Sequence, residues 1–283
     1  MMNILSKLDE DIRLRGFSEK TREAYLGNAK RYLGFLGDRA IEETSEADVR
    51  HYSAYLRDVR HLAPKTINTY LDAVIFLYEV TLERQLGRRQ VPRMKLPKRL
   101  PVLLSRSELK VLLDATDNTK HRAMLSLGYG SGLRASEVCN LKVGDIDSKE
   151  MRLLIRNGKG NKDRHTVLSQ TSLAYLRQYW KMYRPCHPEG YLFCGHYGFP
   201  LTTDACNSAF KAALKRAGLA SEGRTYHLLR HCFATYMLED GTPLLTLKEL
   251  LGHASLSSTM VYLHLINVSR ELQCPIDKGA CGD

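Results

Sequence analysis

Long apolar segments are missing from this sequence of 283 residues. No uncharged run reaches the length of a membrane-spanning helix, and Asp9, Glu10 and Asp11 stand where a signal peptide would carry its hydrophobic core. These absences argue against a membrane protein and favour a soluble, cytoplasmic one with no membrane partner. Hydrophobic residues make up 43% of the chain, which predicts ordinary buried cores, and the length suffices for two domains.

A regular cysteine framework is also missing. The number of cysteines is odd and their spacing is irregular, so reduced thiols are a better interpretation than a set of disulfides. No Cys-x-x-Cys pair is present, and the cysteines and histidines between 186 and 206 lack the spacing of a zinc site. We therefore expect neither a metal ion nor another cofactor. The cysteines are Cys139, Cys186, Cys194, Cys206, Cys232, Cys274 and Cys281.

Acidic residues are absent between Arg84 and Arg106, a segment that also contains three prolines. Proline disfavours a helix there, and the positive charge suits a phosphate backbone. The whole chain carries a formal charge of +11, which favours a polyanionic partner. We interpret residues 91–101 as a basic linker that contacts double-stranded DNA, with a solvated hinge as the alternative. The expected contacts of the linker region are Arg88, Arg89, Arg93, Lys95, Lys98 and Arg99.

Apolar residues at helical spacing define a first domain over residues 1–90. One apolar stripe runs from Ser18 to Leu36. A second segment begins at Ser45 with Asp48 three residues later, a capping pattern, and a third begins at Pro64. The sequence predicts a small all-helical domain.

A mixed pattern defines a second domain over residues 102–283. Two short alternating segments, 151–156 and 164–168, flank a turn sequence rich in glycine and asparagine, which predicts a β-hairpin. Helical periodicity surrounds this hairpin on both sides. The predicted fold class is mainly α in two domains, the second being α+β with a small antiparallel sheet. The expected helices cover 105–113, 124–129, 172–183, 204–217, 229–238 and 244–251.

Glycines at 128, 130 and 132 imitate a dinucleotide-binding turn, but they follow a helical segment and not a strand. A better interpretation is a turn into a new helix that begins near Arg134. Glu137 then lies on the same helical face as Arg134, where such a pair is usually a surface salt bridge.

The segment from His227 to His231 imitates a zinc-protease motif, but Leu228 stands where that motif needs its catalytic glutamate. His227 and Arg230 share a helical face and together suit a phosphate, since arginine is permanently charged and histidine can donate or carry a proton. A solvated helix start is the plainer alternative.

A last pair of candidates follows the helix that Gly252 is expected to end. Ser257 or Ser258 can cap the next helix, which would carry Tyr262. This turn would bring His253 and Tyr262 together although they are nine positions apart. The alternative for Tyr262 is a partly buried structural aromatic.

Four motifs occur in the order found in the tyrosine recombinase (phage integrase) family: Gly-Leu-Arg134-x-x-Glu137, Gly-Lys159-Gly-x-Lys-x-Arg, His227-x-Leu-Arg230-His, and Leu-Gly-His253 followed by Tyr262. The chain resembles the short Xer-like and integron- or transposon-encoded members over both halves. The resemblance implies a SAM-like helical core-binding domain that clamps DNA, followed by a catalytic domain. It also implies a site-specific recombinase or integrase that cuts and rejoins DNA without ATP, metal or other cofactor.

The resemblance implies a role for each residue of the motifs. Tyr262 would form a 3′-phosphotyrosine link while Arg134 and Arg230 hold the phosphate. His227 would assist proton transfer, His253 would donate to a phosphate oxygen, Glu137 would support the site, and Lys159 would protonate the leaving group.

Two rival functions remain open from the sequence: a type IB topoisomerase that relaxes DNA with a similar site, and a DNA-binding regulator that has lost catalysis. For a recombinase, relatives imply a homo-oligomer, with a dimer on one DNA site and a tetramer in the synapse. Val268, Leu272 and Ile276 recur at four-residue intervals after Tyr262, and we expect this tail to dock on a neighbouring copy.

Overall fold

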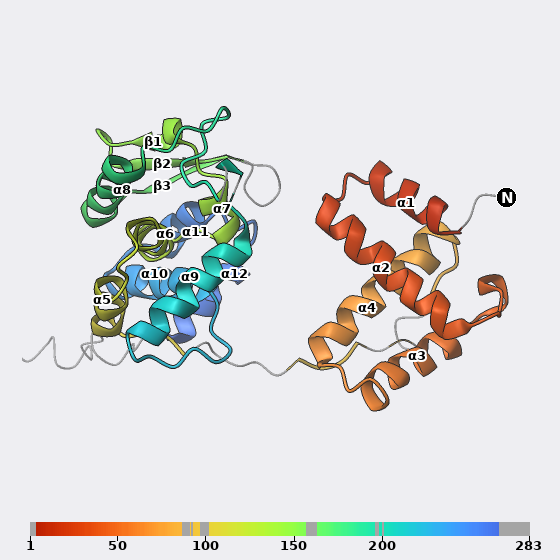
Figure 1. Ribbon diagram of the computed structural model, residues 1–283. Coiled ribbons are helices and arrows are strands. Elements are labelled where there is room, and N and C mark those ends of the chain that lie inside the picture. Colours follow the sequence, from red (N-terminus) through yellow and green to blue (C-terminus); the bar gives the residue numbers. More distant parts are fainter. Residues whose placement is uncertain are drawn as a thin grey trace, which may run out of the picture. The chain divides into compact units, whose positions relative to one another are not determined.

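The computed structural model describes residues 4–86, 91, 93–96, 102–156, 163–195, 198–199 and 201–265. The chain divides into two compact units, Met1–Arg99 and Leu100–Asp283, and each has a hydrophobic core of its own. We call them the amino-terminal unit and, after the role that the resemblance implies, the catalytic unit. The structure confirms the predicted fold class: mainly helical, with a small antiparallel sheet in the second half (Figure 1).

The amino-terminal unit is built from helices α1 (Ile4–Leu14), α2 (Glu19–Leu36), α3 (Glu46–Asp58) and α4 (Pro64–Phe76), with a 3-10 turn at Ile41–Glu43 and a π turn at Leu77–Thr81. The expected capping pattern begins α3, and Pro64 occupies the first turn of α4. The sequence analysis missed α1, whose Leu8 and Ile12 are fully buried.

Buried hydroxyl groups connect the turns of this unit to its helices. The Tyr32 and Tyr78 hydroxyl oxygens lie 2.8 Å apart, and Thr44 also hydrogen-bonds to Tyr78. Asn68 of α4 holds the start of the linker: its Nδ2 donates to the Met94 carbonyl at 2.9 Å, and its Oδ1 accepts from the Met94 N–H at 2.8 Å.

The catalytic unit contains α5 (Arg106–Asp114), α6 (Thr119–Gly130), α7 (Ala135–Cys139), a 3-10 turn (Val143–Asp145), β1 (Ile146–Asp147), β2 (Arg152–Ile155), β3 (Arg164–Val167), α8 (Gln170–Tyr183), α9 (Thr203–Arg216), α10 (His227–Glu239), α11 (Leu244–Leu251), α12 (Ser257–Met260) and a final 3-10 turn (Val261–Leu265). The strands form one antiparallel sheet in the order β1-β2-β3.

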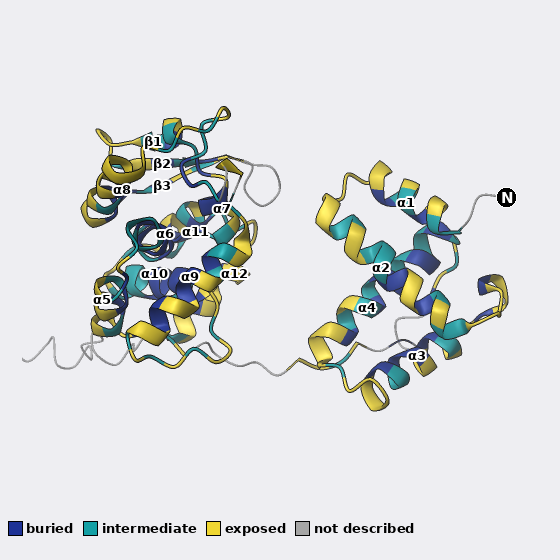
Figure 2. Ribbon diagram, viewed as in Figure 1, coloured by how far each residue is buried: buried dark blue, intermediate teal, exposed yellow. Residues whose placement is uncertain are grey.

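Helices α6 and α10 form the middle of the catalytic unit, where α6 packs against α8, α9 and α10. Figure 2 shows how much of both helices is buried. The predicted strands are confirmed, and Leu153 pairs with Thr166 across them. The turn between them, including Lys159, lies outside the described residues.

Among the described residues, no helix is long and apolar enough to cross a membrane. The five cysteines in the described part of the chain are free thiols, as the sequence predicted, and Cys274 and Cys281 lie outside it.

Candidate active site

A single carboxylate, that of Glu137, lies at the centre of a group of arginines. Its oxygens accept hydrogen bonds from Arg134 Nη1 at 2.7 Å and from the Arg134 backbone N–H at 2.9 Å. Arg164 donates Nη1 and Nη2 to the two oxygens at 2.8 and 2.9 Å, and Arg230 Nη1 lies 3.7 Å away. Three guanidinium groups around one carboxylate leave a net positive charge, which suits a phosphate.

These neighbours keep Glu137 ionised. Burial alone would raise the pKa of Glu137, but the hydrogen bonds and charge of Arg164, the Arg134 N–H and the charge of Arg230 lower it to about 2. Taken alone, the spacing of Arg134 and Glu137 favoured a surface salt bridge, while the motif order made Glu137 a supporting residue of the site. The Glu137 side chain is only 6% exposed, so the surface alternative is wrong.

Arg230 is a fully buried cation held by backbone carbonyls. Its Nη1 donates to the Gly132 carbonyl at 2.7 Å, and its Nη2 donates to the Leu251 carbonyl at 2.6 Å. Its Nε has no partner among the described residues. Burial and the charge of Arg134 lower the pKa of Arg230 to about 10, so the group stays protonated at neutral pH. The ends of α6 and α11 therefore supply the oxygens that hold this arginine.

Two glycines make room for the site. Gly252 ends α11 in the left-handed conformation with φ +63°, as expected, and a Cβ there would lie 2.6 Å from Arg164 Cδ. Gly132 has φ +65°, and a Cβ there would lie 2.4 Å from the Phe233 ring. Any other residue at these two positions would be strained and would displace a neighbour.

Three histidine rings lie beside the arginines. His227 begins α10 and its ring centroid lies 4.5 Å from that of His231. The Nδ1 of His253 lies 2.9 Å from Thr259 Oγ1. Desolvation and the nearby cations lower the pKa of His227 and of His253 to about 4, and desolvation also lowers that of His231. All three rings are therefore neutral at pH 7 in the structure.

Tyr262 is 3% exposed, and its hydroxyl lies 3.2 Å from His231 Nδ1. Its ring is nearly parallel to that of His253, at 11° and 6.3 Å between centroids. Burial raises the pKa of Tyr262, while Arg230 and Arg134 oppose that shift. The hydroxyl is thus a neutral phenol beside a surplus of positive charge.

The approach to Tyr262 differs from the prediction. Helix α12 begins at Ser257 after Leu256, and neither Ser257 nor Ser258 caps it. Instead the Ser257 N–H donates to the Ser255 hydroxyl at 3.2 Å. Tyr262 lies in the following 3-10 turn and not within the helix.

The structure brings together the predicted Arg134, Glu137, His227, Arg230, His253 and Tyr262. Sequence reasoning assigned no role to Arg164, His231 or Thr259, which complete the site. Arg164 stood in the hairpin motif, and His231 had been considered only as a zinc ligand. No group of three or more potential metal ligands occurs in the described part of the chain.

The linker is only partly described. Arg93 forms an ion pair with Asp72 of α4, and Lys95 is exposed. The other predicted contacts, Arg88, Arg89, Lys98 and Arg99, lie outside the described residues.

Known proteins share both the fold and the order of these units. Residues 103–267 match the phage integrase family, and residues 4–88 match the phage integrase N-terminal SAM-like domain. An integrase/recombinase of Sinorhizobium fredii is 38% identical over 267 residues, covering 94% of this chain and 85% of that protein. The tyrosine recombinase XerC of Pediococcus pentosaceus is 31% identical over 274 residues, covering 89% of each chain.

Among solved structures, a lambda integrase dimer bound to a COC′ core site matches with a TM-score of 0.74 at 19% identity, over 97% of this chain and 98% of that one, which shows the shared fold. The fold and the sequence relatives define an enzyme that breaks and rejoins DNA at specific sites. The chain belongs to the phage integrase family, and the recombinase interpretation is confirmed over the topoisomerase and the silent regulator.

Proposed function

We propose that Tyr262 is the nucleophile of this recombinase. Its hydroxyl oxygen attacks a DNA phosphorus, the bond to the 5′ oxygen breaks, and a 3′-phosphotyrosine forms. A 5′-hydroxyl of another strand then attacks that phosphate and releases the tyrosine. The observation that carries this proposal is the Tyr262 phenol beside Arg230 and Arg134, whose charges favour the phenolate.

The arginines and histidines have separate roles in this proposal. Arg134 and Arg230 hold the non-bridging oxygens, and His253 donates to one of them. Glu137 fixes the guanidinium groups. His227 assists the proton transfer from Tyr262, but His231 lies within hydrogen-bonding distance of the hydroxyl in the structure. Separate His227→Gln and His231→Gln variants therefore test which ring accepts the proton.

A nicked suicide substrate tests the nucleophile, because the strand that leaves after cleavage cannot return. The wild-type chain should form a covalent protein–DNA adduct, with or without EDTA. Tyr262→Phe should bind DNA and form no adduct, whereas Tyr183→Phe, an exposed tyrosine at the end of α8, should react as the wild type does. Adduct formation by Tyr262→Phe would overturn the assignment, and an absolute need for Mg²⁺ in cleavage would overturn the metal-free mechanism.

Lys159 remains the proposed general acid, on the resemblance of its motif. Lys159→Ala should cleave ordinary DNA slowly but recover when sulfur replaces the 5′-bridging oxygen, because a thiolate leaves without a proton. Rescue of His227→Ala but not of Lys159→Ala would assign the acid to His227.

We also propose that residues 1–90 and 102–283 close on DNA as a clamp joined by the basic linker 91–101. Each unit has its own core, which supports independent binding surfaces. Binding should weaken steeply with salt. If either piece alone binds a site as tightly as the whole chain, the clamp proposal fails.

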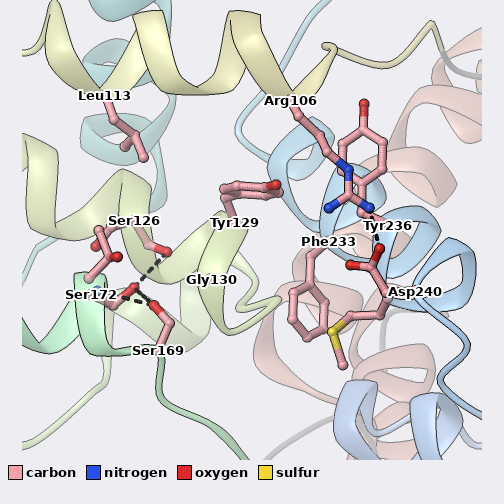
Figure 3. A pocket seen from close by; sticks show the side chains of 12 residues that line it. Arg106, Leu113, Ser126, Tyr129, Gly130, Ser169, Ser172, Phe233, Tyr236 and Asp240 are labelled. Carbon is pink, nitrogen blue, oxygen red and sulfur yellow. Dashed lines mark hydrogen bonds and ion pairs between the residues drawn. The ribbon is translucent and has the colours of Figure 1, made fainter.

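A homo-oligomer, with a dimer on each DNA site and a tetramer in the synapse, completes the proposal. The catalytic unit has a cavity of about 300 Å³. Figure 3 shows Tyr129 and Phe233 among the side chains that line it. The same two residues belong to the apolar cluster around Tyr262 and Leu265, the last described residue. In this proposal, the tail beyond Leu265 of one copy, with its apolar Val268, Leu272 and Ile276, occupies this cavity on a neighbouring copy. Deletion after Ser269 should preserve binding to a single site and impair recombination, and unchanged recombination would overturn this role.

A further inference from the structure

Thr259 is a buried residue of the active site to which the mechanism proposed above gives no task. It belongs to α12, stands three positions before Tyr262, and is fully buried. Its Oγ1 lies 2.9 Å from Nδ1 of His253. This hydroxyl has no other hydrogen-bond partner among the described residues.

The direction of this hydrogen bond decides where the proton of the His253 ring lies. Desolvation and the charge of Arg230 lower the pKa of His253 to about 4, so at neutral pH the ring carries one proton, on Nδ1 or on Nε2. If Nδ1 carried it, Thr259 would accept, and the proton of the buried hydroxyl would have no acceptor among the described residues. A buried donor without an acceptor costs free energy. The hydroxyl is therefore the donor, and the proton of the ring lies on Nε2.

A proton on Nε2 suits the role of His253 in cleavage. The ring is half-buried, and its Nε2 has no hydrogen-bond partner among the described residues, so this N–H is free to donate to a ligand. Arg230, Arg134 and Arg164 all act on the ring, which places it within the positive charge of the site. The other tautomer would carry a lone pair on Nε2, which cannot donate to a phosphate oxygen.

The segment that carries the nucleophile also carries this hydroxyl. His253 follows Gly252 at the end of α11, whereas Thr259 lies in α12 and Tyr262 in the 3-10 turn after it. The Tyr262 ring is nearly parallel to that of His253, at 11°. Packing of this one short segment therefore places the nucleophile and fixes the neighbouring histidine together.

We propose that Thr259 is a positioning residue that holds the proton of His253 on Nε2, so that this ring can donate to a phosphate oxygen. The hydrogen bond at one nitrogen of a histidine sets which nitrogen carries the proton. The inference rests on the proposed function, in which His253 contacts the phosphate. It also extends that function, because the donor is complete only while the segment that carries Tyr262 is packed against His253.

Nitrogen-15 NMR of the full-length chain at pH 7, without DNA, tests the tautomer without any reaction. The resonances of His253 are identified by their loss in His253→Ala. The wild type should show a protonated Nε2 and an unprotonated Nδ1, and Thr259→Ser, which keeps the hydroxyl, should show the same. Thr259→Val should show a mixture of both tautomers. A protonated Nδ1 in the wild type, or an unchanged spectrum in Thr259→Val, would overturn the proposal.

The rate of adduct formation on the suicide substrate tests the consequence for cleavage. Thr259→Val should slow the reaction by about tenfold, the effect of one hydrogen bond, while Thr259→Ser should stay near the wild-type rate. Thr116→Val is the matched control, because Thr116 of the same unit is also fully buried and its hydroxyl donates to the Leu112 carbonyl at 2.8 Å. It should lose thermal stability and cleave at the wild-type rate. Equal rates for Thr259→Val and Thr116→Val would contradict the proposal.

The His253→Ala background separates an action through His253 from a general structural role. His253→Ala alone should slow adduct formation by about 100-fold, as expected for the loss of one donor to the reacting phosphate. Thr259→Val should add no further loss in that background. A further tenfold loss would show that Thr259 supports Tyr262 or the fold directly, and its role toward His253 would be wrong. Absence of any adduct in the wild type, together with the expected NMR spectra, would overturn the proposed function and leave the tautomer assignment standing.

Discussion

The two units of this recombinase bury polar groups of different kinds. The catalytic unit buries charge: Arg230 and Glu137 lie inside the protein and belong to one connected network. The amino-terminal unit buries hydroxyls, those of Tyr32, Tyr78 and Thr44, and keeps its ion pairs near the surface. Neutral groups lose less hydration free energy on burial than ions do. The buried charge is thus concentrated where we propose that the phosphate is bound and attacked.

This difference can be measured one unit at a time. Trp180 of α8 is the single tryptophan of the chain, so its fluorescence reports unfolding of the catalytic unit alone. Far-UV circular dichroism reports the helices of both units. A change seen by circular dichroism and not by fluorescence therefore belongs to the amino-terminal unit.

The largest effect is expected from the central carboxylate. Glu137→Gln leaves three buried or half-buried guanidinium groups without the carboxylate that they share. This should lower the free energy of unfolding of the catalytic unit by about 3 kcal/mol. Asp9→Asn is the matched control, because Asp9 also meets two arginines, Arg13 and Arg22, but in the amino-terminal unit and near the surface.

Urea denaturation followed by Trp180 fluorescence checks this prediction. Asp9→Asn should leave the fluorescence transition in place and change the dichroism little, since surface ion pairs contribute little. Equal losses of stability in the two variants would mean that the charge network of the catalytic unit is no more strongly coupled than a surface pair.

How far the sequence predicts this molecule depends on the distance between interacting residues. Helices with a clear apolar period were found, because periodicity is a local signal. Helix α1 was not predicted, although Leu5, Leu8 and Ile12 have helical spacing. Strand β1 is two residues long and offers no alternation to detect.

The site shows the same limit more sharply. The order of the motifs indicated which side chains to bring together, but not what holds them. Arg164 is 27 positions from Glu137 and 86 positions from the Leu250 carbonyl that its Nε contacts, so its role follows from tertiary packing alone. The 3-10 turn at Tyr262 likewise follows from its packing against α10, which local propensity does not encode.

A smaller loss of stability is expected at Gly252, whose backbone has a positive φ and which lies against Arg164 of the charge network. Gly252→Ala should cost about 1 kcal/mol for the positive φ and about 1 kcal/mol more for displacing Arg164. Gly16→Ala, in the amino-terminal unit, has a similar φ of +66° but no atom within 4 Å of its added Cβ, so only the first cost applies.

Thermal unfolding measures both glycine variants, with fluorescence for Gly252 and circular dichroism for Gly16. Gly252→Ala should also slow adduct formation, since Arg164 supports Glu137. If Gly252→Ala costs no more than Gly16→Ala and cleaves normally, Arg164 moves aside freely, and the site is less rigid than its hydrogen bonds indicate.

Acidification should weaken the catalytic unit through His253. Its pKa is about 4 in the folded protein and about 6.5 when unfolded, so the unfolded chain binds the proton more readily between these values. Stability should therefore fall as pH decreases from about 6.5 to 4, and the fall should level off below 4. The ring is partly exposed, so solvent screening limits the effect to about 1 kcal/mol.

A pH series of denaturation curves checks this with two substitutions. His253→Asn keeps a polar atom near Thr259 and should reduce the loss between pH 6.5 and 4, leaving the share of His227, whose pKa is also about 4, and the later loss from Glu137 below about pH 4.5. His51→Asn, at an exposed position of α3, should retain the wild-type profile of the fluorescence transition. An unchanged profile for His253→Asn would assign the pH dependence to His227 or His231.

The smallest effect concerns the hydroxyl network of the amino-terminal unit. Tyr78→Phe removes the hydroxyl that connects Tyr32 and Thr44, and should lower the free energy of unfolding of this unit by about 1 kcal/mol, the usual contribution of a neutral hydrogen bond. The Arg84 guanidinium over the Tyr78 ring stays charged and the hydroxyls stay neutral over this range, so the loss should be the same at pH 5 and pH 8. Tyr25→Phe, a half-buried tyrosine without a hydrogen-bond partner among the described residues, controls for removal of a phenolic oxygen.

Circular dichroism should detect the loss of stability in Tyr78→Phe while Trp180 fluorescence stays unchanged. A pH-dependent loss for Tyr78→Phe, or a loss larger than that of Glu137→Gln, would show that the two units do not differ in the way their buried polar groups indicate.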